Sequence, residues 1–477
     1  MPKPLAPPLK APDGLPVPQR YRSMAVILLG ISMSVLDVSI VNLALPGIVR
    51  DLRATAASAV WVVTAYQVAI LVMLLPCAML GDRIGHRRVY LAGLSLFTLA
   101  SLGCAFASSL GMLVGARAVQ GLGAGGLMSV NSALVRQTYP RHLLGRGIAL
   151  NSVIVATASV AGPTIAAVIL SIASWPWLFA VNLPLGAAVF LLGRTALPPP
   201  VRSAPASAGP PALDVALNVG MFALVFLGAD ALGANAAGRS AWLNAPASAA
   251  LAFAGVAIGV FYVQRQRRLA TPLLPLDLLR IPVFALSVCT SIAAFAAQTL
   301  SSVALPFLLL EALGRSPAQA GLLLTASPLG TVIAAPVAGR LIGRVPDGLL
   351  GAIGLATMAC GLALLALLAA RPSNADIAWR LALCGIGFGL FQSPNNHTIV
   401  TTAPVRRAGA ASGMLGTARL TGQTAGSVLL AVIFGLFGAH ATQGPQVALG
   451  AAAAFAATAA VFSGLRLKVP REAAQAA

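Results

Sequence analysis

Residues 24–46 read MAVILLGISMSVLDVSIVNLALP, and this stretch decides the fold class of the chain. It is long enough to cross the hydrocarbon core of a bilayer as one helix. It is apolar except for small polar side chains and one carboxylate, Asp37. A carboxylate inside a span costs several kcal/mol or more, so such a residue is a candidate for function. Two interpretations stay open: a functional acid, and a structural acid that a partner satisfies.

Composition places the whole chain among membrane proteins. Of its 477 residues, 58% are hydrophobic and 9% are charged, whereas soluble domains have about 25% charged residues. The alternating strands of a β-barrel are missing from the sequence, so we expect an all-α polytopic membrane protein. We predict fourteen spans, at 24–46, 58–80, 89–107, 110–131, 147–172, 177–193, 214–233, 246–263, 282–309, 317–339, 348–369, 379–400, 408–437 and 446–464.

The net charge of +20 follows the predicted topology. With the N-terminus in the cytoplasm, 23 of the 31 Lys and Arg residues fall in cytoplasmic segments, six on the opposite side and two inside spans. This positive-inside asymmetry predicts both termini in the cytoplasm, across a bacterial-type inner membrane. Such residues attract anionic lipid headgroups, so we expect lipids, and no nucleic acid, as partners.

The chain also divides into segments. We expect a disordered cytoplasmic tail at 1–23, a six-helix bundle at 24–193, a linker with two inserted spans at 194–281, a second six-helix bundle at 282–464 and a cytoplasmic tail at 465–477. The Pro- and Ala-rich composition of the linker supports the boundary between the bundles. The pattern Gly-x-x-Ile-Gly at 81–85 recurs at 339–343, which is a weak sign of two related halves.

Signatures of enzymes, ATPases and metal sites are missing from the sequence. None of the three lysines, Lys3, Lys10 and Lys468, follows a glycine, which excludes a Walker A motif. There is no HExxH motif, and the five cysteines form no CxxC pair. We therefore expect no enzyme activity and no metal or other cofactor.

A second charge, Arg117, lies inside the span 110–131, and Gln120 follows it by about one helical turn. At 1.5 Å per residue, Asp37 lies about 14 Å and Arg117 about 10 Å from the same membrane face. The two charges are thus at similar depth, and an Asp–Arg relation across a cavity is possible if the two spans are neighbours. Glycines at 121, 123, 125 and 126 permit close helix contact.

Other polar side chains inside spans are candidates for the lining of a cavity. Hydrogen bonding between helices is the other open interpretation for them. The candidates are Tyr66, Asn151, Gln298, Gln392, Asn395, Asn396, Arg419 and Gln423.

Several motifs together resemble the major facilitator superfamily, specifically its fourteen-helix drug:proton antiporters. Residues 36–46, LDVSIVNLALP, are similar to the first-helix motif LDxTxVNVALP of that family. Residues 117–123 match its RxxQGxG motif, and Gly162-Pro163 matches its antiporter motif. The turn at 82–88 matches the loop signature of that family at Asp82, Arg83, Gly85, Arg87 and Arg88. It departs from the signature at His86, where the family usually has Arg or Lys.

The resemblance implies a monomeric secondary exporter that works by alternating access and exchanges its substrate for protons. The implied substrates are drugs or other small molecules, lipophilic or cationic. An exporter of an endogenous metabolite (an amino acid, an antibiotic or a siderophore) is the first alternative, and a membrane sensor or channel is the second. The implied roles are substrate or proton binding at Asp37 and Asn42, proton coupling at Arg117 and Gln120, a gating loop at 82–88, and an antiporter helix at Gly162 and Pro163.

Overall fold

The computed structural model describes residues 14–199, 212–236, 244–269, 275–369, 371–403, 407–438 and 442–469. These residues form sixteen α-helices. Their one bridge of β type, between Ile342 and Val345, is isolated and belongs to no strand. The expected all-α class is therefore confirmed.

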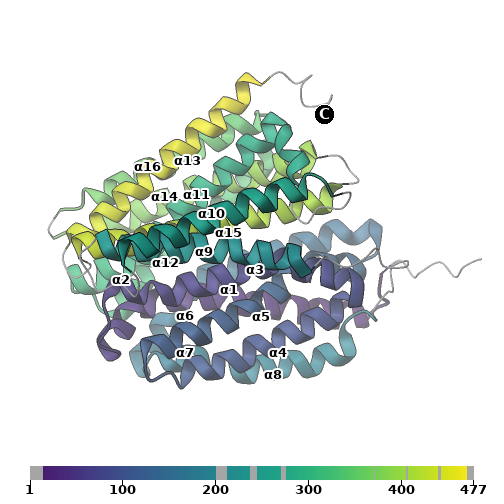
Figure 1. Cartoon of the computed structure of the whole chain (residues 1–477), viewed down its shortest axis with the longest axis horizontal. Coiled ribbons are helices and arrows are strands. Elements are labelled where there is room, and N and C mark those ends of the chain that lie inside the picture. The colour runs from purple at the N-terminus through teal and green to yellow at the C-terminus, as the bar shows by residue number, and fades with distance from the viewer. Residues whose placement is uncertain are drawn as a thin grey trace, which may run out of the picture.

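The first bundle contains six long helices and two short ones (Figure 1). Close contact between α5 and α3 requires glycine at position 121, because a Cβ there would lie 2.4 Å from the carbonyl oxygen of Tyr66. The first helix begins at Gln19, inside the tail that the sequence predicted to end at residue 23. The helices are α1 (Gln19–Asp51), α2 (Ala56–Ala59), α3 (Trp61–Ile84), α4 (His86–Ala105), α5 (Leu110–Thr138), α6 (Leu144–Ile172), α7 (Pro176–Ala180) and α8 (Asn182–Ala196).

The second bundle contains six long helices. Its helix α15 approaches α11 closely, and a Cβ at Gly422 would lie 2.2 Å from the carbonyl oxygen of Ile292. Gly85 and Gly343 both have positive φ, 102° and 84°, so the repeated sequence pattern also gives a repeated turn. The elements are α11 (Pro282–Phe307), η3 (Leu308–Ala312), α12 (Pro317–Leu341), α13 (Asp347–Ala366), α14 (Asn374–Thr402), α15 (Ala408–Phe437) and α16 (Gln443–Leu465).

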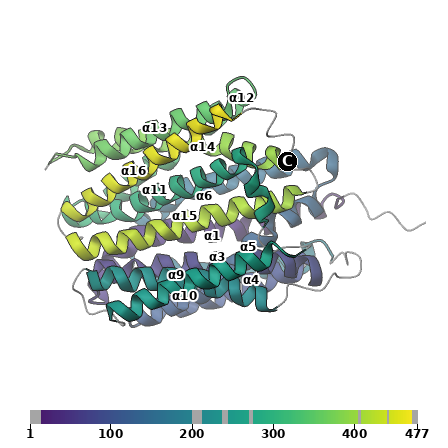
Figure 2. The ribbon, with the colours of Figure 1, turned by 45° about the horizontal axis from the view of Figure 1, so that its top comes forward.

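Two further helices, α9 (Ala212–Ala236) and α10 (Ala245–Gln266), pack against each other as a hairpin (Figure 2). Arg265 Nε donates to Asp214 Oδ1 across this hairpin at 2.6 Å. Helix α9 contacts both α3 and α15, one from each bundle. The inserted pair therefore lies across the seam between the bundles rather than inside either one.

Twelve helical segments of the described chain are long and apolar enough to cross a membrane. This makes the chain a multi-pass membrane protein. Two more helices, α5 and α14, have 29 residues each but are not among the twelve. Both carry charged and amide side chains that lower their mean hydropathy. The structure thus supports twelve of the fourteen predicted spans by composition.

The two bundles meet tightly at one end, which we call the closed end. An apolar cluster there combines Leu45 and Val49 from the last turns of α1 with Val303 and Phe307 from the last turns of α11. Arg50 and Glu311 add an ion pair of 3.5 Å between the bundles. This closed end lies further along α1 than the cavity described next, whose lining on α1 ends at Leu43.

Candidate functional site

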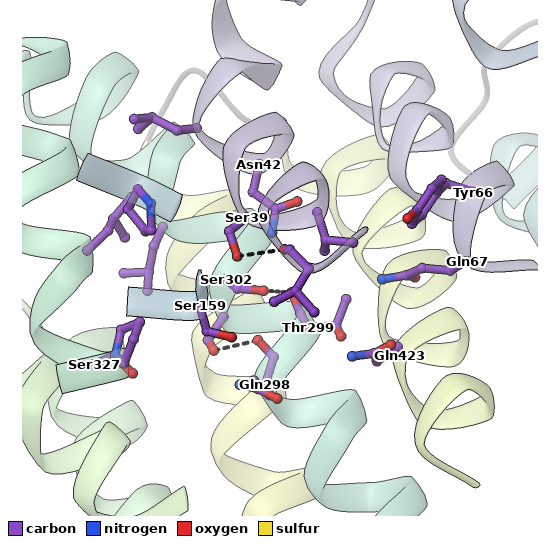
Figure 3. A pocket seen from close by; sticks show the side chains of 18 of the residues that line it. Ser39, Asn42, Tyr66, Gln67, Ser159, Gln298, Thr299, Ser302, Ser327 and Gln423 are labelled. Atoms are coloured by element: carbon purple, nitrogen blue, oxygen red, sulfur yellow. Dashed lines mark hydrogen bonds between the residues drawn. The ribbon is translucent and has the colours of Figure 1, made fainter. Parts of the chain in front are cut away.

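A cavity of about 210 Å³ lies between the two bundles (Figure 3). Helices α1, α3, α5 and α6 line it from the first bundle, and α11, α12, α14 and α15 line it from the second. A cavity at this interface changes shape whenever the bundles move relative to each other. Its polar lining consists of Ser34, Ser39, Asn42, Tyr66, Gln67, Ser159, Gln298, Thr299, Ser301, Ser302, Ser327, Arg419 and Gln423.

Asp37 and Arg117 form an ion pair inside the first bundle. Arg117 Nη1 donates to Asp37 Oδ2, and the side chains of Arg117 and Asp37 are only 0% and 1% exposed. Arg117 Nη1 also donates to Gln120 Oε1 at 2.6 Å, and Gln120 Nε2 donates to Asp37 Oδ1 at 2.9 Å. The structure therefore brings together the two charges that the sequence placed at similar depth, with Gln120 beside them.

Two further residues complete this network. Asn182 Nδ2, on α8, donates to Asp37 Oδ1 at 3.3 Å. Ser101 Oγ, on α4, accepts from Gln120 Nε2 at 2.9 Å and from Asn182 Nδ2 at 3.4 Å. Asn182 had a visible signal, an amide in an apolar span, but nothing in the sequence separates Ser101 from other serines in spans.

Tyr66 separates the ion pair from the cavity. Its ring centroid lies 4.1 Å from the guanidinium carbon of Arg117, and its side chain also lines the cavity. The Tyr66 hydroxyl donates to the Ser34 carbonyl at 3.3 Å, which fixes the ring against α1. Asp37 is not part of the cavity wall. Direct pairing of Asp37 with a cationic substrate therefore finds no support in this arrangement.

The other members of the two family motifs lie on the cavity side of α1 and α6. Asn42 and Pro163 line the cavity, and Asn42 Oδ1 is buried with no hydrogen-bond partner in the described residues. Gly162 lets α6 approach α1 closely, because a Cβ there would lie 2.4 Å from Ser39 Cβ. The antiporter motif thus sits at a helix contact beside the cavity.

The remaining candidates for the cavity lining divide into two groups. Gln298, Arg419 and Gln423 line the cavity. Asn151, Gln392, Asn395 and Asn396 are not part of the wall of this cavity. Asn395 shows the physical reason, because its amide is used inside the second bundle. Its Nδ2 donates to Ser291 Oγ at 2.8 Å, and its Oδ1 accepts from Arg466 Nη1 at 3.0 Å.

The turn at 82–88 is held mainly by its own bundle. Asp82 Oδ1 lies 3.1 Å from Nε2 of His86, and the Asp82 side chain is 75% exposed. His86 Nδ1 lies 3.1 Å from Nε2 of Gln137 on α5. Arg87 donates to the carbonyl oxygen of Arg194 at the end of α8. In this structure Asp82 therefore pairs within its own turn.

The sequence matches the model of the Major Facilitator Superfamily over residues 27–291 and 286–477. The chain belongs to this superfamily. It is 54% identical over 460 residues to the protein named "Uncharacterized transporter YebQ" of Escherichia coli K12, covering 96% of this chain and 98% of that one. It is 31% identical over 403 residues to "Multidrug resistance protein Stp" of Mycobacterium tuberculosis, covering 84% and 73% of the two chains. It is 29% identical over 402 residues to "Riboflavin transporter RibZ" of Clostridioides difficile, covering 84% and 85%.

These matches confirm the resemblance to the drug-efflux members of the major facilitator superfamily. The relatives of this chain named above are transporters and not enzymes. Within the described ranges, no group of three or more His, Cys, Asp or Glu side chains is arranged to hold a metal ion. This superfamily member thus combines a cavity between two bundles with a buried ion pair that lies behind Tyr66 in the cavity wall.

Proposed function

We propose that the chain is a monomeric, proton-coupled exporter of small amphipathic molecules, a multidrug-efflux protein that confers drug resistance. The observation that carries this proposal is the position of the Asp37–Arg117 pair, buried behind Tyr66. A proton-driven exporter requires a titratable group whose protonation state affects the substrate site. Asp37 meets this requirement through Arg117 and Tyr66 rather than by contact with the substrate.

Protonation of Asp37 would neutralise the carboxylate and remove the charge partner of Arg117. Losing one partner of a buried ion pair is worth about 3–5 kcal/mol. Two conformations of a protein commonly differ by only a few kcal/mol, so this change is large enough to shift their populations. Any movement of Arg117 also moves the ring stacked on it, Tyr66, which lines the cavity. Proton binding and substrate binding would then affect each other reciprocally.

We also propose fourteen crossings of a bacterial inner membrane, with both termini in the cytoplasm. Helices α5 and α14 would complete the twelve compositional spans, because both are long and pack within the bundles. With this topology α1 ends at the outer face. The closed end with Arg50 and Glu311 is then the outer gate, and the described conformation faces inward.

Cysteine labelling tests this topology in sealed cells. A thiol reagent added outside should label cysteines introduced at Ser109 and Arg371. It should also label position 239 but not positions 202 or 406, all three of which lie outside the described residues. Labelling at position 202 from outside would contradict the placement of the inserted hairpin.

The names of the relatives suggest two classes of substrate. A multidrug resistance protein and a riboflavin transporter both align with most of this chain, so a natural metabolite is the second candidate. Inverted membrane vesicles that contain the protein test transport itself. An exporter should accumulate substrate when a proton gradient is applied, and a protonophore should abolish the accumulation. A channel would only equilibrate the substrate, and a sensor would not move it.

A further inference from the structure

Arg419 on α15 is the second arginine inside a predicted span, and its surroundings differ from those of Arg117. It lines the cavity, as does Gln423 one helical turn further along. Its Nε is buried and has no hydrogen-bond partner among the described residues. One recorded contact is with the Phe295 ring, whose centroid lies 5.2 Å from the guanidinium carbon.

No described Asp or Glu side chain balances this charge. The lining contains no acidic residue, and the charge of nearby Asp37 is already paired with Arg117. Within the parts of the chain that the structure describes, no ion pair involves Arg419. The cavity therefore carries one excess positive charge in a setting of low dielectric, where an unpaired charge is expensive.

A structural role accounts for only part of this cost. A cation–π contact such as that with Phe295 is worth about 0.5–2 kcal/mol, and it leaves the N–H groups in the guanidinium plane unused. A guanidinium has five such donors in a fork that fits a carboxylate with two parallel bonds. The side-chain amides of Gln298 and Gln423 line the same cavity and supply further donors. The site is therefore rich in hydrogen-bond donors and has one unbalanced positive charge.

We propose that this cavity binds small organic anions, with a carboxylate or equivalent acidic group on Arg419. The apolar part of such a molecule would contact Leu305, Leu324 and Leu420, which also line the cavity. This inference specifies the substrate class of the exporter proposed above and rests on the same cavity. It does not depend on Asp37 as the proton site, and it replaces the expectation of cationic substrates.

Three dansyl probes that share one fluorophore test the charge preference. They are dansylglycine (an anion), dansylglycinamide (neutral) and N-(2-aminoethyl)dansylamide (a cation), and binding to the purified full-length protein is followed by dansyl fluorescence. We expect the wild-type protein to bind the anion at least tenfold more tightly than the amide, and the cation most weakly. Arg419→Gln should weaken binding of the anion at least tenfold and leave binding of the neutral amide unchanged. Arg419→Lys should retain much of the affinity for the anion. Arg340→Gln removes an exposed arginine outside the cavity on α12 and should change neither affinity.

Equal affinity for the three probes, a preference for the cation, or no binding of dansylglycine would overturn the proposal. So would an Arg419→Gln protein that loses the neutral probe as strongly as the anion, because Arg419 would then only shape the wall. Binding is measured without a proton gradient, so it is separate from coupling. Tight anion binding together with no gradient-driven transport would contradict the proposed exporter and leave this inference intact.

Discussion

Asp37→Asn removes one charge from the buried pair and keeps the size of the side chain. The amide oxygen of the new side chain can still accept from Gln120 and Asn182, which lie 2.9 and 3.3 Å from Oδ1. Its amide nitrogen would face Arg117 Nη1, so that donor meets donor where the ion pair stood. Arg117 would keep its bonds to the Val62 carbonyl (2.9 Å) and to Gln120, but lose its charge partner.

The size of the effect follows from the unpaired guanidinium. Removing one partner of a buried pair costs about 3–5 kcal/mol, so we expect the detergent-solubilised variant to unfold at a clearly lower temperature. Because the cost comes from the orphaned charge, Arg117→Gln in the same chain should restore most of the lost stability. The double variant should still fail to couple, since neither a titratable acid nor its partner remains at this site.

Coupling is measured as the proton-driven accumulation of the dansyl probes in inverted vesicles. The accumulated amount is normalised to the amount of folded protein. Asp37→Asn and the double variant should accumulate less than a tenth of the wild-type amount. Asp214→Asn is the matched control, because Asp214 is also only 1% exposed and ion-paired, to Arg265 in the α9–α10 hairpin. It should lose stability but keep transport. Wild-type accumulation by Asp37→Asn would refute the reasoning and place the proton site elsewhere.

Substitutions at three further positions test the wall of the cavity, the helix contact beside it and the loop at 82–88. Tyr66→Phe should keep the contact with Arg117 and transport normally, and it should lose about 0.5–1.5 kcal/mol of stability with the hydroxyl hydrogen bond. Tyr66→Ala should open the cavity wall and uncouple proton flow from substrate flow, which is measured as a proton leak into vesicles. Gly162→Val should cost about 1–3 kcal/mol by forcing α6 away from α1, measured as thermal stability, whereas Gly47→Val, where a Cβ meets nothing within 4 Å, should cost much less. Asp82→Asn should leave thermal stability and probe binding nearly unchanged, since the Asp82 side chain is exposed. It should slow transport if the loop pairs across the bundles in another conformation. A normal transport rate would mean that the loop is only a topogenic charge cluster.

The pairing of Asp37 with Arg117 was predictable because charges inside apolar spans have few ways to be satisfied. Two opposite charges at the same depth are natural partners, and the fixed rise of a helix gives the depth from the sequence. The rotation of α1 was not predictable in the same way. This helix is apolar on all sides, so no polar stripe marks which face meets the cavity. The sequence could therefore not show that Asn42 faces the cavity while Asp37 lies behind its wall.

The second bundle shows the same limit in its polar residues. Arg419 and Asn395 look alike in the sequence, as polar groups in glycine- or proline-containing apolar spans. One lines the cavity and the other binds Arg466, 71 positions away in the chain. No local periodicity encodes a partner that distant. Helices α5 and α14 are not among the twelve spans recognised by composition. Helices inside a bundle can hold polar side chains that lipid-facing helices cannot, and these side chains lower the mean hydropathy.

The charge of the substrate determines how strongly the membrane potential would act on transport. Moving one elementary charge across 100 mV is worth about 2.3 kcal/mol. If one proton enters for each monovalent anion exported, two charges move in the favourable direction, and the potential contributes about 4.6 kcal/mol per 100 mV. For a neutral substrate the contribution falls to about 2.3 kcal/mol, and for a monovalent cation the exchange is electrically silent. Arg419, which has no ion pair among the described residues, would thus favour the substrates that draw most on the potential. The buried Asp37–Arg117 pair carries no net charge, so in the proposed mechanism its charge changes only when a proton binds.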